Sequence, residues 1–195
     1  DGVRLLRRTA DDFDGTAPDS FDTVILNSVV QYFPDIHYLF RVLEGAVRSV
    51  RPGGAVFVGD VRSLPLLKAY HSAVRLGKAP DDLPLKELEQ LIHRDMAAET
   101  ELVADPAFFT TLPRRLPKIG HAQVLLKRGT YQNELTRFRF DVILHIGETP
   151  ALAENVTRLD WNRENLSLSG VRKRLSDGNS GILELTGIPN SRVGK

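Results

Sequence analysis

A strand–helix–strand unit in the first third of the chain constrains the fold more than any other feature. Residues 21–27 (FDTVILN) form an apolar run that is typical of a strand buried on both faces of a parallel sheet. Apolar residues recur with helical spacing over 36–50, after the start signal 34–35 (PD) and before the stop signal 52–54 (PGG). Residues 55–59 (AVFVG) predict a second buried strand. Parallel strands joined through a helix predict an α/β fold with a right-handed crossover.

Periodicity and turn residues predict the remaining elements. The expected strands are residues 3–6, 121–127, 138–146 and 182–186. The expected helices are residues 64–76, residues 84–102, a short one from residue 105, and one near 168–176. The two long strands, 121–127 and 138–146, should pair antiparallel at one edge of the sheet, because a turn and a polar loop join them.

Composition argues against several classes of function. The formal net charge is +1, so no broad field attracts nucleic acid or an anionic membrane. No apolar run approaches the roughly 20 residues of a membrane span. Cysteine is absent, which removes disulfides and thiolate metal sites and fits a reducing compartment, so we expect a cytoplasmic protein. None of the five histidines is spaced as a metal pair beside a carboxylate, so no metal site is expected.

Polar side chains follow three consecutive expected strands at their carboxyl ends. The three segments are residues 10–13 (ADDF), 27–32 (NSVVQY) and 60–63 (DVRS). In open parallel sheets, ligands bind outside the carboxyl ends of the strands. Any one of these segments alone is better explained as a loop or a helix cap. Three together predict a ligand crevice.

Residues 133–141 (NELTRFRFD) lead into the last long strand. Phe138 and Phe140 alternate with Arg139 and Asp141, so the two pairs should lie on opposite faces of the sheet. A half-exposed edge strand with solvated arginines explains the same pattern. Spacing alone therefore assigns this segment no function.

Four stretches of the sequence resemble a known family. They are FDTVILNSVVQYFP, PGGAVFVGDVRSLPLLKAYHSAV, NELTRFRFDVIL and LTGIPNSR. In this order, and over essentially the whole chain, they resemble the methyltransferase domains embedded within adenylation domains of nonribosomal peptide synthetases. The resemblance implies a partial Rossmann-like class I methyltransferase fold with S-adenosylmethionine as cofactor. It also implies, in most cases, methylation of the α-amine of an aminoacyl group held as a thioester on a carrier domain.

The resemblance assigns roles to individual residues. The implied cofactor-binding set is Ala10, Asp11, Asp12, Phe13, Asn27, Ser28 and Val29. The implied catalytic set is Asn27, Tyr32, His71 and Glu134, without a ranking of which group takes the proton of the amine. The implied substrate-binding set is Gln31, Asp60, Arg62, Asn133 and Arg137. Without the resemblance, the sequence around His71 is more simply explained by a buried structural histidine, because the residue lies on an apolar-rich helix.

The same resemblance predicts the organisation of the chain. Residues 1–150 are expected to form a partial methyltransferase core. Residues 64–116 interrupt the strand pattern after the second ligand-facing strand end, so we expect them to form a mobile helical cover over the acceptor. Residues 151–195 are expected to lead back toward the host adenylation domain. That domain and the phosphopantetheinyl carrier domain are the implied partners.

One departure from the family pattern changes what is expected. The family begins with a strand that ends in a glycine-rich turn and a second strand that ends in an acid for the ribose, and this sequence has neither. It starts at about the third strand of a sheet whose usual order is 3-2-1-4-5-7-6. We therefore expect a four-stranded remnant of residues 21–27, 55–59, 121–127 and 138–146, with residues 3–6 displaced. A catalytically incompetent or bridging module is one alternative function, and transfer to carbon or oxygen is another.

This 195-residue chain is expected to bind S-adenosylmethionine weakly or not at all when it is alone. Losing several hydrogen bonds at about 1–3 kcal/mol each would turn a micromolar site into a millimolar one. Isothermal titration calorimetry measures the affinity directly. Tight binding to the isolated chain would contradict the expectation.

Overall fold

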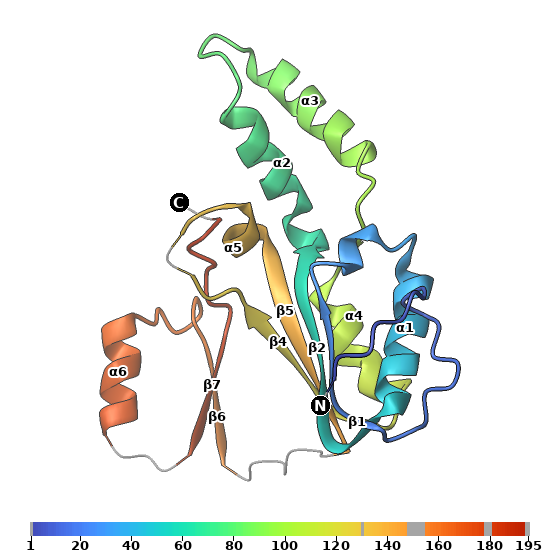
Figure 1. The fold of residues 1–195 in the computed structure, drawn as a ribbon. Helices are drawn as coiled ribbons and strands as arrows, with labels where there is room; N and C mark the ends of the chain where they lie inside the picture. Colours follow the sequence, from blue (N-terminus) through green and yellow to red (C-terminus); the bar gives the residue numbers. More distant parts are fainter. Residues whose placement is uncertain (1, 130, 148–154, 178–180, 194–195) are drawn as a thin grey trace. The chain divides into compact units, whose positions relative to one another are not determined.

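A mixed five-stranded sheet organises the first part of the chain in this computed structural model (Figure 1). Its main path runs β1 (Phe21–Asn27), β2 (Val50–Ser63), β5 (Arg139–Ile146) and β4 (Ile119–Leu126). β1 and β2 are parallel, whereas β5 is antiparallel to both of its neighbours. A short strand, β3 (Val103–Ala104), pairs in parallel with the end of β2. The α/β class and the antiparallel pair are confirmed, and the order matches the 4-5-7-6 half of the expected sheet.

The structure describes residues 2–129, 131–147, 155–177 and 181–193. The chain divides into two compact units, Asp1–Thr149 and Pro150–Lys195. The boundary expected between residues 150 and 151 lies outside the described residues. Within them, no helix is both long enough and apolar enough to cross a bilayer.

The N-terminal segment does not form the strand expected at residues 3–6. Residues 3–6 were predicted as a strand, but they form no regular element, and Val3 and Leu5 are exposed. Backbone donors and acceptors need partners, and those of a segment outside the sheet can take them from water. The segment is thus displaced from the sheet, as the remnant hypothesis expected.

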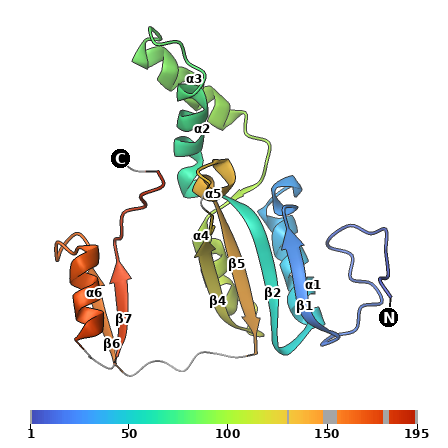
Figure 2. The same cartoon turned by 60° about the vertical axis from the view of Figure 1, so that its left-hand side comes forward.

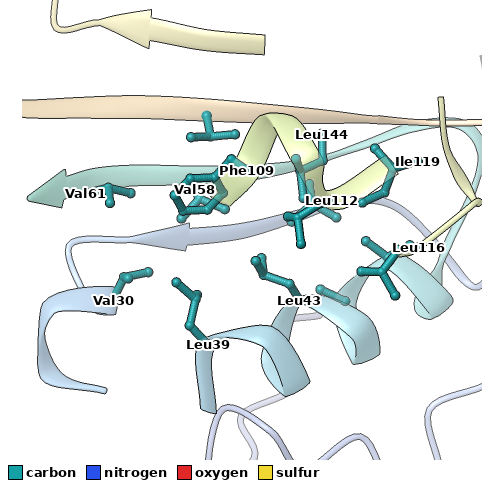
Figure 3. Packing of buried hydrophobic residues seen from close by; sticks show 14 of the residues in the cluster. Val30, Leu39, Leu43, Val58, Val61, Phe109, Leu112, Leu116, Ile119 and Leu144 are labelled. Atoms are coloured by element: carbon teal, nitrogen blue, oxygen red, sulfur yellow. The ribbon is translucent and has the colours of Figure 1, made fainter. Parts of the chain in front are cut away.

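Two helices pack on the same face of the sheet (Figures 1 and 2). α1 (Ile36–Ser49) begins after Asp35, whose side chain accepts a hydrogen bond of 2.7 Å from the Tyr38 amide and so caps the helix. α4 (Pro106–Thr111) carries Phe109, which is fully buried. Both helices bury their apolar side chains against β2 and β5, and this layer is the core of the first unit (Figure 3).

The other face of the sheet is only partly covered in the first unit. Ile25, Phe57 and Ile143 are neighbours in register across β1, β2 and β5. Their strand neighbours Val56 and Val142 point into the core and are fully buried, so these three side chains point the opposite way. Ile25 is exposed, and the other two are half-buried.

A helical hairpin extends beyond the carboxyl end of β2 (Figures 1 and 2). It consists of the short 3-10 helix η2 (Leu64–Leu66), α2 (Leu67–Leu76) and α3 (Leu85–Ala97). The hairpin confirms the two predicted helices, except that α3 ends at Ala97 rather than near 102. The chain then returns to the sheet through β3.

A one-turn helix replaces the expected approach to the last strand. α5 (Glu134–Phe138) begins at Asn133, whose side chain accepts a hydrogen bond of 3.1 Å from the Thr136 amide. The Thr136 hydroxyl in turn accepts one of 3.2 Å from the Asn133 amide, which completes a capping box. Only a polar loop before a strand from residue 138 was expected from the sequence, and this helix was missed because the capping pattern was not recognised. From Phe140 onward, the predicted alternation of buried and half-buried residues is confirmed.

The second unit is a small strand–helix–strand motif. β6 (Val156–Asp160) and β7 (Ile182–Thr186) are parallel, and α6 (Leu168–Ser176) connects them. The helix and the second strand were predicted. β6 was missed because its short polar sequence, VTRLD, lacks a continuous apolar run.

Phe109 provides a test of the core. Its ring meets the rings of Phe108 and Phe140 edge-on, with centroids 5.1 and 5.8 Å apart. Phe109→Ala should lower the free energy of unfolding by about 3–5 kcal/mol, because it removes a fully buried ring and leaves a cavity. Urea denaturation measures the change. Leu85→Ala, at an exposed position, is the control and should change stability by less than about 0.5 kcal/mol. Equal effects of the two changes would contradict the described core.

Candidate functional site

Polar side chains converge where β1 and β2 end. Asn27 is the last residue of β1, and it pairs in register with Gly59 of β2. The next amide, that of Ser28, donates a hydrogen bond of 3.2 Å to the Gly59 carbonyl. This contact holds the two strand ends together and brings Ser28 beside Asp60, as the sequence predicted for neighbouring parallel strands.

Two residues at this edge have a left-handed backbone. The φ angle is 57° at Ser28 and 62° at Asp60, and neither residue is glycine. Such conformations cost on the order of 1–3 kcal/mol each and are often found at functional sites. At Asp60 the cause is visible, since the pairing of β2 with β5 shifts register between Val58 and Val61. This bulge turns the Asp60 carboxylate away from the regular pleat.

The Asp60 carboxylate is held from two sides. One oxygen, Oδ2, accepts a hydrogen bond from the Ser28 hydroxyl. The other, Oδ1, lies 2.7 Å from the ammonium nitrogen of Lys127, which follows β4. The bulge also takes the Asp60 amide out of the regular ladder, and Asp141 supplies its acceptor at 3.0 Å. Lys127 lies 3.0 Å from the same oxygen of Asp141.

The charges of this cluster stabilise one another. Burial raises the pKa of the Asp60 carboxyl, but hydrogen bonds from Lys127 and Ser28 and the charges of Lys127 and Arg139 outweigh it, so the pKa is lowered. Burial lowers the pKa of Lys127, but its hydrogen bonds to Asp60 and Asp141 and the charges of those carboxylates raise it overall. The contribution of Asp60 to stability is lost as the pH falls through its lowered pKa. That of Lys127 is lost as the pH rises through its raised pKa.

The Asn27 carboxamide is positioned by a glycine and a hydroxyl. Its amide nitrogen lies 3.3 Å from the Ser28 hydroxyl oxygen, to which it donates a hydrogen bond. Its carbonyl oxygen packs against the Cα of Gly59, where a Cβ atom would overlap it. Asn27 itself is exposed. The Ser28 hydroxyl and Gly59 therefore fix the orientation of this exposed carboxamide.

A second polar cluster lies at the base of the helical hairpin. The Arg62 guanidinium pairs with Glu99 at 2.7 Å and with Glu101 at 2.9 Å, and it lies 4.9 Å from the centroid of the Tyr70 ring. Arg62 is only 8% exposed. Burial raises the pKa of Glu99, but the hydrogen bonds from Arg62 and the Glu101 amide, together with the charge of Arg62, outweigh it, so the pKa is lowered. The Arg62 guanidinium thus connects β2 to the segment that follows α3.

His71 lies in this second cluster. Its Nε2 atom is 3.3 Å from a Glu99 oxygen, but the angles do not suit a hydrogen bond, and no other described residue provides a hydrogen-bond partner for this atom. The ring is 9% exposed and meets the Tyr70 ring edge-on at 5.0 Å. This placement matches the interpretation of His71 as a buried structural histidine.

Gln31 joins the loop after β1 to the segment that follows α3. It is 5% exposed. Its side-chain nitrogen donates a hydrogen bond of 3.0 Å to the Ser28 backbone carbonyl, and its backbone carbonyl accepts one of 2.8 Å from the Leu102 amide. Its side-chain oxygen is buried and finds no hydrogen-bond partner in the described part of the chain. Val29 is exposed, and Tyr32 is 74% exposed, so these two remain accessible at the edge.

Residues 10–13 lie along α1. The carboxylate of Asp11 is 3.5 Å from the Arg41 guanidinium. A hydrogen bond with Tyr38 is the main reason that the pKa of Asp11 is lowered, and smaller contributions come from Thr9 and Arg41. The Asp11 carboxylate is thus held in its charged form beside the first turns of α1.

The other members of this segment have separate contacts. The Phe13 ring packs on Gly45 of α1, at a place where a Cβ atom would overlap it. Asp12 accepts a hydrogen bond of 3.0 Å from the Asp14 amide, and Ala10 is half-buried in a turn. At least one face of the Phe13 ring is therefore already occupied by the helix.

The acceptor-side block is built around α5. Asn133 caps the helix, and the Arg137 guanidinium lies 5.0 Å from the centroid of the Phe138 ring. Glu134 is largely exposed, 3.6 Å from Arg139. Glu134 and Arg139 line an open depression of about 440 Å³ together with residues of the second cluster: Arg62, Tyr70, His71, Glu99 and Glu101. The structure thus brings Glu134, Arg62 and His71 to one depression.

Two residues of the site were missed by the sequence analysis. Lys127 was predicted only as a strand end, and Asp141 only as a half-exposed strand residue. The predicted antiparallel pairing was the signal that could have found them, because Leu125 pairs with Asp141 and thereby places Lys127 close to it. Among the described residues, no group of three or more histidine and acidic side chains is arranged to hold a metal ion.

Gly59→Ala tests how Asn27 is positioned. The added methyl group should displace the Asn27 carboxamide, and overpacking should lower the free energy of unfolding by about 1–3 kcal/mol. The side-chain amide signals of Asn27 in ¹H–¹⁵N NMR spectra report the displacement. Gly2→Ala is the control, because no heavy atom lies within 4 Å of its Cβ position. Unmoved Asn27 signals in Gly59→Ala would contradict this account.

Known proteins resemble the chain over nearly its whole length. It is 46% identical over 196 residues to chondramide synthase cmdD of Chondromyces crocatus, which covers 98% of this chain and 5% of that protein. It is 35% identical over 162 residues to peramine synthetase ppzA of Metarhizium rileyi, covering 82% of this chain and 6% of that protein. It is 33% identical over 179 residues to cyclosporin synthetase simA of Tolypocladium inflatum, covering 88% of this chain and 1% of that protein. The chain thus spans a small part of each relative.

No protein-family model matches the chain. Among solved structures, an O-methyltransferase family protein from Burkholderia thailandensis matches 76% of this chain and 37% of its own, with a TM-score of 0.41 and 16% identity. A methyltransferase from Thermotoga maritima, described as a possible histamine N-methyltransferase, matches 75% of this chain and 65% of its own, with a TM-score of 0.40 and 20% identity. Likenesses this low carry no argument about function. The sequence relatives show that the chain belongs to the nonribosomal peptide synthetases, as one segment of such a protein.

Proposed function

We propose that the intact domain containing this chain transfers a methyl group from S-adenosylmethionine to the α-amine of an aminoacyl group held on a carrier domain. The observation that carries the proposal is the supported Asn27 carboxamide at the carboxyl edge of two parallel strands, where ligands of such sheets bind. The relationship to peptide synthetases supports an amino acid as the acceptor. The host adenylation domain and the carrier are then the partners, and the site of action is the cytoplasm.

The cofactor side is supplied in part by residues of this chain. When bound, S-adenosylmethionine supplies an electrophilic methyl group. The ionised Asp11 carboxylate, held beside α1, can accept a hydrogen bond from the exocyclic amine of adenine. Ser28 and Val29 lie at the strand edge next to Asn27, on the side where the sulfonium and the acceptor would meet. These residue types fit the cofactor.

The acceptor amine must present its lone pair, so the site must hold it without its extra proton. The Asn27 carbonyl oxygen can accept a hydrogen bond from an N–H of the neutral amine and orient it. Such alignment matters because methyl transfer to nitrogen needs little covalent help from the protein.

The amine also loses a proton after it is methylated, and accessible groups are the best candidates to take it. The Tyr32 hydroxyl and the Glu134 carboxylate are exposed, whereas His71 is buried against Glu99. We therefore favour Tyr32 or Glu134 over His71 as the proton acceptor.

Mass spectrometry of the loaded carrier tests the proposal. The intact domain, incubated with S-adenosylmethionine, should add one methyl group to the nitrogen of the aminoacyl group. Asn27→Ala should slow the transfer by about 10- to 100-fold through loss of alignment. Leu85→Ala, at an exposed position, is the matched control and should transfer at the wild-type rate.

Other outcomes would replace the proposal with a different function. A methyl group on carbon or oxygen would assign the domain to another transfer. No transfer from a folded and complete domain would favour a bridging module of the synthetase.

A further inference from the structure

One lysine connects three strands at the candidate site. The ammonium of Lys127 lies 2.7 Å from Asp60 Oδ1 and 3.0 Å from Asp141 Oδ1, so β4, β2 and β5 meet at a single cation. All three side chains are at most 20% exposed. An ammonium this well surrounded is poorly placed to bind a ligand, but it is well placed to hold two carboxylates.

The contacts continue from Lys127 to Asn27 without a gap. Lys127 binds one oxygen of Asp60, and the other oxygen accepts a hydrogen bond from the Ser28 hydroxyl. The Ser28 hydroxyl oxygen in turn accepts the hydrogen bond from the Asn27 amide. The orientation of the Asn27 carboxamide therefore depends on the orientation of Asp60.

We propose that Lys127 is a positioning residue for methyl transfer, acting through Asp60 and Ser28 to fix the exposed Asn27 carboxamide. The inference rests on the proposed function for its effect on rate, but its effect on Asn27 can be observed without catalysis. Lys127 touches neither cofactor nor substrate in this account.

The charged groups around Asp60 should make the effect of replacing Lys127 depend on pH. The groups that face Asp60 are Lys127 just after β4, Asp141 and Arg139 from β5, and the uncharged hydroxyl of Ser28. Glu134 of α5 pairs with Arg139 and reduces the effect of that cation. Lys127 is thus the cation in contact with both carboxylates.

Without Lys127, the two carboxylates would repel each other. Like charges that share a site raise the pKa of one of them, so a proton can then bind between Asp60 and Asp141. At lower pH this proton would partly replace the missing ammonium. At higher pH the repulsion would turn Asp60 away from Ser28 and release Asn27.

The experiment compares Lys127→Met with wild type in the intact domain at two pH values. The variant-to-wild-type ratio of methyl-transfer rates should be about 0.1 or less near pH 8.5, and should recover several-fold near pH 6, where a shared proton restores the pairing. Taking the ratio removes the pH dependence of the acceptor amine itself. Lys127→Arg retains a cation and should lose less activity than Lys127→Met at the higher pH.

Lys118→Met is the matched control. Lys118 precedes the same strand, and its ammonium pairs with Asp19 at 2.6 Å and donates to the carbonyls of Arg48 and Val50. Its loss removes a comparable set of contacts at the opposite end of β4. The Lys118→Met ratio should therefore be the same at both pH values.

A second measurement keeps the inference testable whatever the activity is. The Asn27 side-chain amide signals in ¹H–¹⁵N NMR spectra should move with pH in Lys127→Met and stay fixed in wild type over the same range. The double variant Lys127→Met/Asp141→Asn removes the repulsion, so its Asn27 signals should no longer move.

The outcomes separate the two proposals. A wild-type domain that transfers no methyl group would overturn the proposed function, and the NMR measurement would still decide the role of Lys127. A Lys127→Met ratio that is equal at both pH values, together with Asn27 signals that do not move with pH, would overturn the positioning role.

Discussion

The bulge at Gly59 and Asp60 is the constraint on which the candidate site depends. It removes the Asp60 amide from the regular ladder and turns the carboxylate toward β1. Every later contact follows from that change. Asp141 accepts the hydrogen bond of the free amide, Lys127 balances the carboxylates, and Ser28, whose own backbone is left-handed, donates to Asp60. Glycine at 59 then leaves the room that the Asn27 carboxamide occupies.

Elements with strong periodicity could be predicted from the sequence, and elements defined by local hydrogen bonds could not. The apolar run 21–27 and the helical spacing over 36–50 gave the positions of β1 and α1 almost as expected. The expected burial of β1 on both faces was wrong, because β1 is an edge strand and its residues are exposed or half-buried. α5 was missed because its capping box satisfies backbone groups through Asn133 and Thr136, without any apolar period. The two-residue strand β3 exists only because the end of β2 offers it a partner.

The candidate site was predictable in position but not in the roles of its charged residues. Strand ends placed Asn27, Ser28 and Asp60 together, since parallel strands end at one edge. A sequence does not show which charges neutralise one another, because that depends on distance and burial. Arg62 thus proved to be buried between two glutamates, and Lys127 became visible as a partner of Asp60 only once the strands were paired.

The left-handed backbone of Ser28 has a consequence for protein engineering. Glycine adopts this conformation without steric cost, so Ser28→Gly would relax the chain by about 1–3 kcal/mol while removing two side-chain hydrogen bonds, to Asp60 and from Asn27, of about 1 kcal/mol each. The two effects nearly cancel in a melting experiment. A library selected only for heat resistance would therefore accept glycine at this position freely, and would pass variants in which the carboxylate at 60 no longer reaches the neighbouring strand.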